Sequence, residues 1–455
     1  MEKTIAAIST APAPGGIGIV RISGGEAFAV AEKVFRGVSG KKLSQMKGYT
    51  AQLGGAYTPG GEKLDDVVAL VYRGPKSYTG EDVVELSCHG GLYMTKRLLQ
   101  LVLDAGAAPA GPGEFTRRAF LNGKMDLAQA EAVMGLISAS GEQARKAALA
   151  GSTGVLSRKI ESIKQGLLEQ AAHLAAWADF PEEDVPQVEE AALLEGIRQG
   201  EKALEELLQG FDRGRMYREG LVTVIAGRPN AGKSTLMNLL SGCQRSIVTQ
   251  YAGTTRDVVE ETVMVAGVPL RLADTAGIRD TDDPVESIGV QAARQRLETA
   301  QLVLAVFDSS QALEKEDWEL MDALEKVPAI AIGNKSDLPT RMDVEAIQKR
   351  FEKTVSLSAA TGEGLAALEQ ALSEILDTKD FHPQEGVLFT QRQRMDAQTA
   401  LDSLREGEQA LVLGLTLDAV TVCVEDALHA LAALTGEQVS EEIVDRVFEE
   451  FCVGK

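Results

Sequence analysis

The sequence has 455 residues, and 46 Lys and Arg against 67 Asp and Glu give it a formal net charge of −21. Apolar residues make up 44% and charged residues 25%, which is typical of a soluble globular protein of about three domains and excludes disordered and fibrous chains. The acidity also excludes a protein that holds nucleic acid mainly through a diffuse basic surface. It does not exclude nucleic acid that binds to a local basic patch or is held by a basic partner protein.

Cysteine usage and hydropathy indicate the compartment. The four cysteines, at positions 88, 243, 423 and 452, are scattered and form no Cys-x-x-Cys pair, as expected in a reducing compartment. No apolar run approaches the roughly 18 residues of a membrane helix, and Pro12 and Pro14 interrupt the N-terminus before a signal-peptide core forms. We therefore expect a cytoplasmic protein without a membrane segment.

Residues 1–120 are predicted to form a mixed α+β domain. Short apolar runs at 17–22, 67–71 and 83–86 are separated by turn signals such as Gly60-Gly61, a pattern typical of strands.

Residues 121–215 and 379–455 share a helical texture. In the first of these segments, apolar residues recur every three or four positions, which predicts one face of an amphipathic helix; they are Leu156, Ile160, Ile163, Leu167, Ala171 and Leu174. Between them, residues 216–378 alternate helical patterns with near-continuous apolar runs at 221–226, 302–307 and 329–332, as in buried parallel strands. The order predicts an α/β domain inserted into one discontinuous helical domain.

The strongest motif is Gly227-Arg-Pro-Asn-Ala-Gly-Lys-Ser234, which matches G-x-x-x-x-G-K-[ST] between a predicted strand and a predicted helix. Such a P-loop surrounds phosphate oxygens with backbone N–H groups at a helix N-terminus. We expect Lys233 to contact the outer phosphates and Ser234 to bind Mg²⁺. The expected phosphate contacts are Asn230, Ala231, Gly232, Lys233, Ser234 and Thr235.

Three later segments indicate a guanine nucleotide. Asp274-Thr-Ala-Gly277, Asn334-Lys-Ser-Asp337 and Ser358-Ala-Ala360 each follow a predicted strand. The Asp337 carboxylate would accept hydrogen bonds from guanine N1–H and the 2-amino group, Ser358 and Ala359 would offer backbone contacts to the base oxygen, and Asp274 would hold Mg²⁺ through water. Together with the P-loop, these segments predict a Ras-like GTPase domain. Its further nucleotide contacts are expected at Thr275, Ala276, Gly277, Asn334, Lys335 and Ala360.

The residue that orients the attacking water is not evident. Ras-like proteins place a glutamine after the Asp-x-x-Gly motif, but that position here is Ile278. The acidic residues at 280–286 are candidates for orienting the attacking water, but each of them is also consistent with a solvated loop residue. No arginine finger can be assigned, although Arg256 and Arg279 lie in the two switch regions, so a cation could neutralise the developing charge instead.

The whole chain resembles the MnmE (TrmE) family of bacterial tRNA-modification GTPases, which belongs to the TrmE-Era-like group. The resemblance is based on the switch Gly253-Thr-Thr-Arg-Asp257, on Asn230, on Val20–Gly24, Tyr78–Asp82, Cys88–Gly91 and the segments 112–116 and 122–127, and on the tail Cys452-Val-Gly-Lys455. The Thr-Thr-Arg-Asp switch also occurs in ribosome-assembly GTPases, whereas the N-terminal motifs and the tail do not.

The resemblance implies how the GTPase is activated. In that family the G domains of a homodimer pair across their switches when GTP and K⁺ are bound. The K⁺ would lie near Asn230, Thr249, Tyr251 and Thr254, with Thr249, Thr254 and Thr255 also contacting GTP. Mg²⁺ would be held by Ser234 and Thr255. Glu286 would position the attacking water, so that Glu286 and Lys233 are the expected catalytic residues.

The resemblance also implies a folate site in the N-terminal domain. A 5-formyl- or 5,10-methylene-tetrahydrofolate would bind at Arg21, Glu85 and Lys124, with Lys455 approaching from the tail. Cations can pair with the folate carboxylates, and a carboxylate can accept from pterin N–H groups. Cys452 is a candidate nucleophile with Lys455 as its neighbouring cation, and the alternative is a small buried residue.

The implied function is a GTPase that modifies the wobble uridine of certain tRNAs at C5. It would add an aminomethyl or carboxymethylaminomethyl group together with MnmG (GidA), a flavoprotein that uses FAD and NADH, in a heterotetramer or larger complex. Two alternatives remain: a nucleotide-gated regulatory module and a ribosome-assembly GTPase. The last should carry a basic RNA-binding appendage, and no run of Lys and Arg occurs after residue 380.

Overall fold

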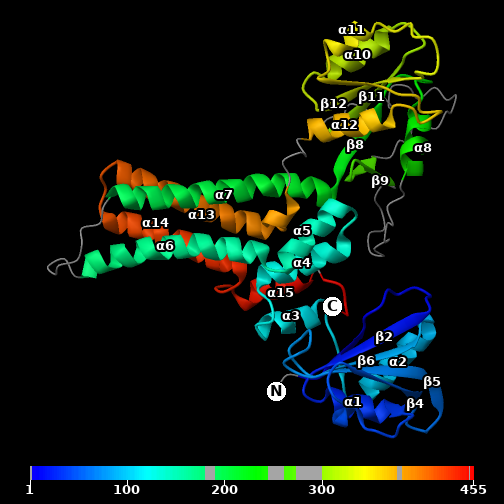
Figure 1. Cartoon of the computed structure of the whole chain (residues 1–455), viewed down its shortest axis with the longest axis vertical. Helices are drawn as coiled ribbons and strands as arrows, with labels where there is room; N and C mark the ends of the chain where they lie inside the picture. The colour runs from blue at the N-terminus through cyan, green and yellow to red at the C-terminus, as the bar shows by residue number, and fades with distance from the viewer. Residues whose placement is uncertain are drawn as a thin grey trace. The chain divides into compact units, whose positions relative to one another are not determined.

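The computed structural model describes residues 3–179, 190–243, 261–272, 300–376, 382–449 and 451–454. Its contacts divide the chain into two compact units. The first combines Met1–Met134, Ile160–Val188 and Gln409–Lys455, and the second combines Gly135–Lys159 and Glu189–Glu408. Figure 1 shows the elements of both.

The N-terminal domain in the first unit is built on a seven-stranded sheet with the strand order β3-β4-β5-β6-β2-β1-β7. All neighbouring strands are antiparallel except β1 and β7. The expected strands at 17–22, 67–71 and 83–86 are confirmed. The strands are β1 Ile5–Ile8, β2 Ile17–Ser23, β3 Phe35–Gly37, β4 Thr50–Tyr57, β5 Lys63–Tyr72, β6 Val83–His89 and β7 Ala108–Pro109.

Helices cover one face of this sheet. On the opposite face, which we call the open face, Phe115 packs against Ile5 and Ala7, and several side chains of the other strands are exposed. Helices α1 (Ala27–Val34) and α2 (Leu92–Asp104) lie against β2 and β6 (Figure 1). Alternate residues of β5 therefore differ in burial: Val67 and Ala69 are completely buried, whereas Val68 is 40% exposed. This period of two follows from the strand pleat, and it places every second side chain on the open face.

Further helices complete the first unit. Lys164 on α6 donates to both carboxylate oxygens of Glu437 at 2.6 and 2.7 Å, joining segments 273 residues apart. The helices are α3 Glu114–Leu121, α4 Leu127–Ser138, α6 Val155–Asp179, α14 Leu417–Thr435 and α15 Glu441–Glu449, with a 3-10 turn η1 at Leu43–Gln45. The predicted apolar face of α6 is confirmed, since Leu156, Ile160 and Leu167 are at most 1% exposed.

The G domain in the second unit has a six-stranded sheet with the order β13-β12-β11-β8-β10-β9. Among the strand pairs of the described residues, β9–β10 is antiparallel and the others are parallel. The expected buried parallel strands are confirmed. The elements are β8 Leu221–Ala226, α8 Lys233–Cys243, β9 Glu261–Val265, β10 Val268–Leu272, β11 Leu302–Asp308, α10 Lys315–Ala323, β12 Ala329–Asn334, α11 Val344–Gln348, β13 Lys353–Ser356 and α12 Leu365–Ile375.

Helices that precede and follow the G-domain sequence pack together, which confirms a discontinuous helical region. Helix α7 (Glu190–Glu219) contacts α5 (Glu142–Ser152) and runs beside α13 (Gln391–Val412) in Figure 1. Two ion pairs, Arg198–Glu408 at 2.7 Å and Arg405–Glu205 at 2.6 Å, link α7 to α13. The 3-10 turn η3 (Pro383–Glu385) precedes α13. None of the helices in the described ranges combines the length and apolar composition needed to span a membrane.

Candidate functional site

The P-loop connects the end of β8 to the start of α8. Its backbone takes conformations that side chains disfavour, with φ of 155° at Gly227, 61° at Asn230 and 98° at Gly232. Because α8 begins at Lys233, the loop directs the free N–H groups of the first helical turn, together with the positive end of the helix dipole, toward one point. This arrangement binds an anion such as a phosphate.

Asn334 holds the P-loop against the base-recognition loops. Its buried amide donates to the carbonyl oxygen of Ala231 at 2.8 Å and accepts from the N–H of Ala359 at 2.9 Å. A Cβ on Gly232 would lie 2.1 Å from the same amide nitrogen, so only glycine permits this approach. The side chain of Asn334 thus ties together three segments that were each predicted to contact the nucleotide.

Lys233 lies across the P-loop. Its ammonium donates to the carbonyl oxygens of Gly227 and Arg228, each at 2.9 Å. These bonds keep the charge beside the loop in which phosphate oxygens would bind. Ser234 and Thr235 follow in the first turn of α8, in the position from which a hydroxyl can reach a Mg²⁺ on the phosphates.

The base-recognition end combines Asp337 and Ser358. The Ser358 hydroxyl donates to Asp337 Oδ1 at 2.7 Å, and the Asp337 residue is exposed. Ser358 and Ala359 are buried, whereas the next residue, Ala360, is exposed. The structure therefore places Asn334, Asp337 and the 358–360 loop together, as the guanine-site prediction requires.

Two charged residues support this site and were missed by the sequence reasoning. Asp308 ends β11, is 5% exposed, and accepts from the Lys335 ammonium at 2.7 Å. Burial alone would raise the pKa of Asp308, but hydrogen bonds from Lys335 and Ser310 outweigh it and hold the pKa below its usual value. The available signal was an acidic residue at the carboxyl end of a buried strand.

Arg228 is the second missed residue. Its guanidinium pairs with Glu314 and with buried Asp317, the latter at 3.3 Å, at the start of α10. It also donates to Gln311 Oε1 at 3.0 Å. These contacts fasten the variable part of the P-loop to a neighbouring helix.

Several predicted site residues lie outside the described residues. They are Thr249, Tyr251, Thr254, Thr255, Asp274, Thr275, Ala276, Gly277, Glu286 and Lys455. Their assignments stay predictions from the sequence.

A second polar site lies on the open face of the N-terminal sheet. Arg21 on β2 and Glu85 on β6 are direct cross-strand neighbours, and Arg21 Nε donates to Glu85 Oε1 at 2.8 Å. Tyr72 donates to Glu85 Oε2 at 3.3 Å. With Tyr78 and Val83, these residues line a cavity of about 150 Å³.

The segment Cys452–Gly454 is bound beside this cavity. Val453 forms an antiparallel bridge with Pro112, and the N–H of Gly113 donates to the carbonyl oxygen of Cys452 at 3.3 Å. The carbonyl oxygen of Gly454 accepts from Ser9 Oγ at 3.1 Å and from Arg21 at 3.3 Å. Cys452 itself is partly buried. Arg21 thus contacts both Glu85 and the tail.

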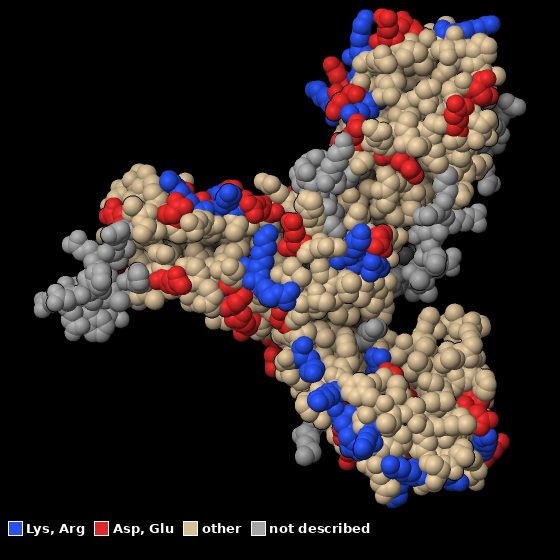
Figure 2. All heavy atoms as spheres, in the orientation of Figure 1, with Lys and Arg blue, Asp and Glu red and all other residues tan. Residues whose placement is uncertain are grey.

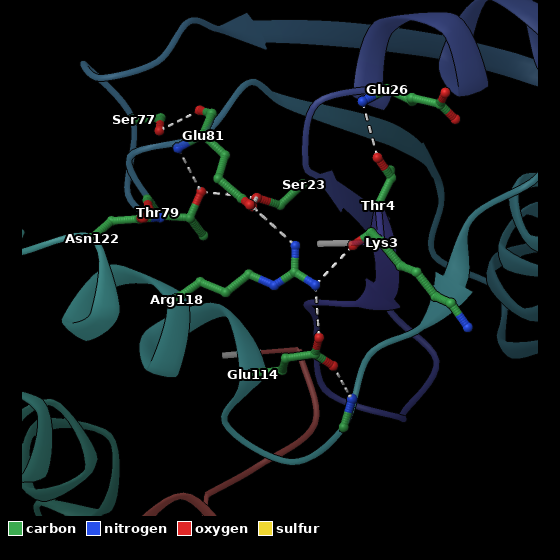
Figure 3. A network of polar contacts seen from close by, with 11 residues as sticks. Lys3, Thr4, Ser23, Glu26, Ser77, Thr79, Glu81, Glu114, Arg118 and Asn122 are labelled. Atoms are coloured by element: carbon green, nitrogen blue, oxygen red, sulfur yellow. Dashed lines mark hydrogen bonds and ion pairs between the residues drawn. The ribbon is translucent and has the colours of Figure 1, made fainter. Parts of the chain in front are cut away.

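A buried arginine network supports the loop that binds the tail (Figure 3). Arg118, 4% exposed, donates to both carboxylate oxygens of Glu81 at 3.2 Å and to Glu114 at 2.8 Å. The other oxygen of Glu114 accepts from the N–H of Gly111 at 2.7 Å. Because Gly111 begins the loop that continues through Pro112, the network holds the partner of Val453 in place.

The structure does not bring Lys124 into the cavity that Arg21 and Glu85 line. Its ammonium donates to the carbonyl oxygen of Pro75 at 3.0 Å, and its side chain lies near Gly80. The assignment of Lys124 to a folate site stays a prediction.

Comparison with known proteins adds family matches to this geometry. A model described as the GTP-binding protein TrmE N-terminus matches residues 4–124, and a model of the MnmE helical domain matches residues 127–452. The chain is 43% identical to the tRNA modification GTPase MnmE of Alkaliphilus oremlandii and 45% identical to that of Symbiobacterium thermophilum. Each alignment covers 100% of both chains.

Proposed function

Because the chain belongs to the MnmE family of tRNA modification GTPases, we propose that it hydrolyses GTP to drive modification of the wobble uridine of certain tRNAs at C5. The family establishes a GTP hydrolase that binds GTP and GDP and acts in tRNA modification. The observation that best supports a guanine-nucleotide site is the position of the Asn334 side chain. It joins the P-loop to the 358–360 loop and to the segment that contains Asp337.

The nucleotide site supports hydrolysis by positioning and by charge. The P-loop N–H groups and the Lys233 ammonium would stabilise the outer phosphates, whose negative charge shifts toward the leaving oxygen in the transition state. The Lys335 ammonium is held by Asp308, which fixes this side chain in the segment that precedes Asp337. Glu286 would orient the attacking water, in place of the glutamine that Ile278 replaces.

Mg²⁺, when bound, would neutralise phosphate charge, with Ser234 and Thr255 as its protein ligands. K⁺ would lie at Asn230, Thr249, Tyr251 and Thr254 and supply the charge that no arginine finger provides.

Potassium is expected to stimulate GTP turnover in comparison with sodium, by about tenfold or more, because a bound K⁺ would neutralise part of the phosphate charge that develops in the transition state. Initial rates in KCl and NaCl at equal ionic strength measure this effect. Choline chloride provides the control for ionic strength. Equal rates in all three salts would contradict the potassium site.

The second site would bind a tetrahydrofolate derivative, which supplies a one-carbon unit when bound. Arg21 offers a donor, Glu85 an acceptor, and Tyr78 an aromatic wall with a pKa raised by burial. The cavity of about 150 Å³ is smaller than the roughly 300–1,000 Å³ typical of whole small-molecule sites. It would therefore hold one polar end of the molecule, with Lys124 and Lys455 acting outside it.

The protein would act as a cytoplasmic homodimer with MnmG, whose FAD and NADH would supply the redox chemistry, in a heterotetramer or larger assembly. Exposed apolar side chains on the open sheet face support self-association: Ile17 is 65%, Leu53 57% and Val68 40% exposed. Cys452, held near Arg21 by the tail, would be the candidate nucleophile of the modification step.

Deletion of the gene is expected to remove the C5 wobble-uridine modification, and mass spectrometry of nucleosides from purified tRNA measures it. Pseudouridine in the same digests provides an internal control, and a plasmid copy of the gene should restore the signal. Normal wobble nucleosides in the deletion strain would refute the proposed function and leave the GTPase assignment standing.

A further inference from the structure

The charge of the chain is distributed unevenly. Residues 1–124 contain fifteen Lys and Arg and eleven Asp and Glu, a formal charge of +4, whereas residues 125–455 carry −25. The net acidity of the protein therefore does not describe its N-terminal domain.

Five exposed cations of this domain lie close together on one surface. Lys33 is in the last turn of α1, Arg36 is in the edge strand β3, and Lys41, Lys42 and Lys47 flank η1. We call these five residues the basic surface. None of them forms an ion pair with any residue that the structure describes.

The acidic residue nearest to the basic surface in sequence does not neutralise it. Glu32, the only acidic residue between positions 27 and 57, accepts a hydrogen bond from the N–H of Ser44 at 2.7 Å. Its carboxylate is thus engaged in holding η1. The Lys33 ammonium donates to the carbonyl oxygen of Ala105 at 2.7 Å, and the Arg36 guanidinium lies over the Tyr57 ring at 4.7 Å. Neither partner is charged, so the positive potential of the five cations remains to attract an anionic ligand.

The basic surface is hollowed. Lys33, Arg36, Lys41 and Lys42 line one depression of about 460 Å³, and Lys41 and Lys47 line a neighbouring one of about 610 Å³. Lys41 belongs to both, so the two depressions adjoin. A polyphosphate backbone could lie along the two depressions, with a Lys or Arg side chain beside successive phosphates.

The loop that carries the lysines is anchored to the domain core. Leu43 and Met46 are buried at 1% and 7% exposure. Arg73 donates to the carbonyl oxygen of Met46 at 3.0 Å and to that of Ser44, and its guanidinium lies over the Phe28 ring at 4.7 Å. The cations are consequently presented by an ordered backbone, which lowers the entropy cost of binding.

Figure 2 shows the same imbalance: along the margin of the N-terminal domain that carries α1, Lys and Arg side chains outnumber Asp and Glu. We propose that the basic surface binds the phosphate backbone of the tRNA substrate. This proposal rests on the proposed tRNA modification and names the surface that holds the substrate. Charge complementarity carries it, because phosphate contacts dominate RNA affinity and the rest of this acidic chain repels RNA. The Arg21–Glu85 cavity lies in the same domain.

Neutralisation tests the proposal. In the full-length protein, the triple variant Lys41→Gln, Lys42→Gln, Lys47→Gln should bind tRNA at least about tenfold more weakly at low salt. The slope of log affinity against log salt should fall by about two to three units, since each lost phosphate contact removes roughly 0.7–0.9. The corresponding triple arginine variant, which keeps the charge, should retain both values.

A matched control removes three exposed lysines from the G domain: Lys315→Gln, Lys326→Gln and Lys349→Gln. It should leave tRNA affinity unchanged, and GTP turnover should be unchanged in every variant. Unaltered tRNA affinity and salt slope in the Lys41/Lys42/Lys47 glutamine variant would overturn the proposal, as would a wild-type protein that binds no tRNA at low salt. Loss of flavoprotein binding with intact tRNA binding would instead make this a protein contact.

Wobble nucleosides measured in strains with each variant separate this proposal from the proposed function. Normal modification in the deletion strain refutes the function. Normal tRNA affinity of the glutamine variant, in a protein whose deletion abolishes modification, refutes the basic surface alone.

Discussion

Replacing Gly454 by alanine is expected to abolish wobble-uridine modification while GTP hydrolysis stays at the wild-type rate. Gly454 has a φ of 99°, and a Cβ there would lie 2.2 Å from the backbone oxygen of Ile8. Backbone on both sides prevents relief by a side-chain movement, so the segment must leave its position. Arg21 and Ser9 would then lose their contact with the Gly454 carbonyl oxygen, and Cys452 would lose the bond that its carbonyl oxygen accepts from the Gly113 N–H.

Complementation of the deletion strain, followed by nucleoside mass spectrometry, measures this effect. Gly25→Ala is a matched control, because Gly25 is in the same domain and a Cβ there meets nothing within 4 Å. Val453→Ala is a second control, since the Val453 side chain is 56% exposed and its bridge to Pro112 uses backbone atoms. Full modification by the Gly454→Ala protein would show that the bound tail is dispensable.

Asp337→Asn is expected to change the nucleotide preference from GTP to xanthosine triphosphate. The carboxylate would accept two hydrogen bonds from guanine, and an amide presents a donor to one of those positions. Losing two charge-assisted bonds and adding a donor–donor conflict should weaken GTP binding about 100-fold or more. Xanthine, with a carbonyl in place of the 2-amino group, would accept from the new amide. Ser358 keeps the side chain oriented through its 2.7 Å bond.

Competition between the two nucleotides for a fluorescent analogue measures the change. Asp343→Asn makes the same charge change in the same domain, and Asp343 caps α11 by accepting from the N–H of Ala346 at 3.1 Å, a role that asparagine also fills. This control should keep its preference for GTP. Retained guanine preference in Asp337→Asn would remove the residue from base recognition.

Local sequence patterns predicted the elements whose structure is determined within one short segment. The strands β8, β11 and β12 were evident because both faces of a central parallel strand are buried, which makes the run continuously apolar. The P-loop was evident because its whole motif spans eight residues and its glycines are required by the positive φ angles of the local backbone. Asp308 was missed for a related reason: it appears as the polar end of an apolar run, and its partner Lys335 is 27 residues away.

Contacts between distant segments could not be predicted in this way. The network from Arg118 to Gly111 depends on how α3 packs against β1, and the bond from Ser9 to Gly454 joins residues 445 positions apart. The basic surface was not predicted because the net charge of −21 is a sum over the whole chain, in which the strongly negative remainder outweighs the positive N-terminal domain. In both cases the missing information was spatial, and a chain-wide average or a local motif does not contain it.

The bond between Ser9 and Gly454 has a consequence for biosynthesis. During translation the N-terminal domain leaves the ribosome about 330 residues before the segment 452–454, which corresponds to roughly 20 to 60 s at 5–20 residues per second. For that interval Arg21, Ser9 and the backbone of Pro112 lack their contacts with the segment 452–454. A chain that terminates before residue 452 could therefore fold its first domain, yet it would lack the contacts of Gly454 with Ser9 and Arg21, so translation through residue 454 is a condition for this arrangement.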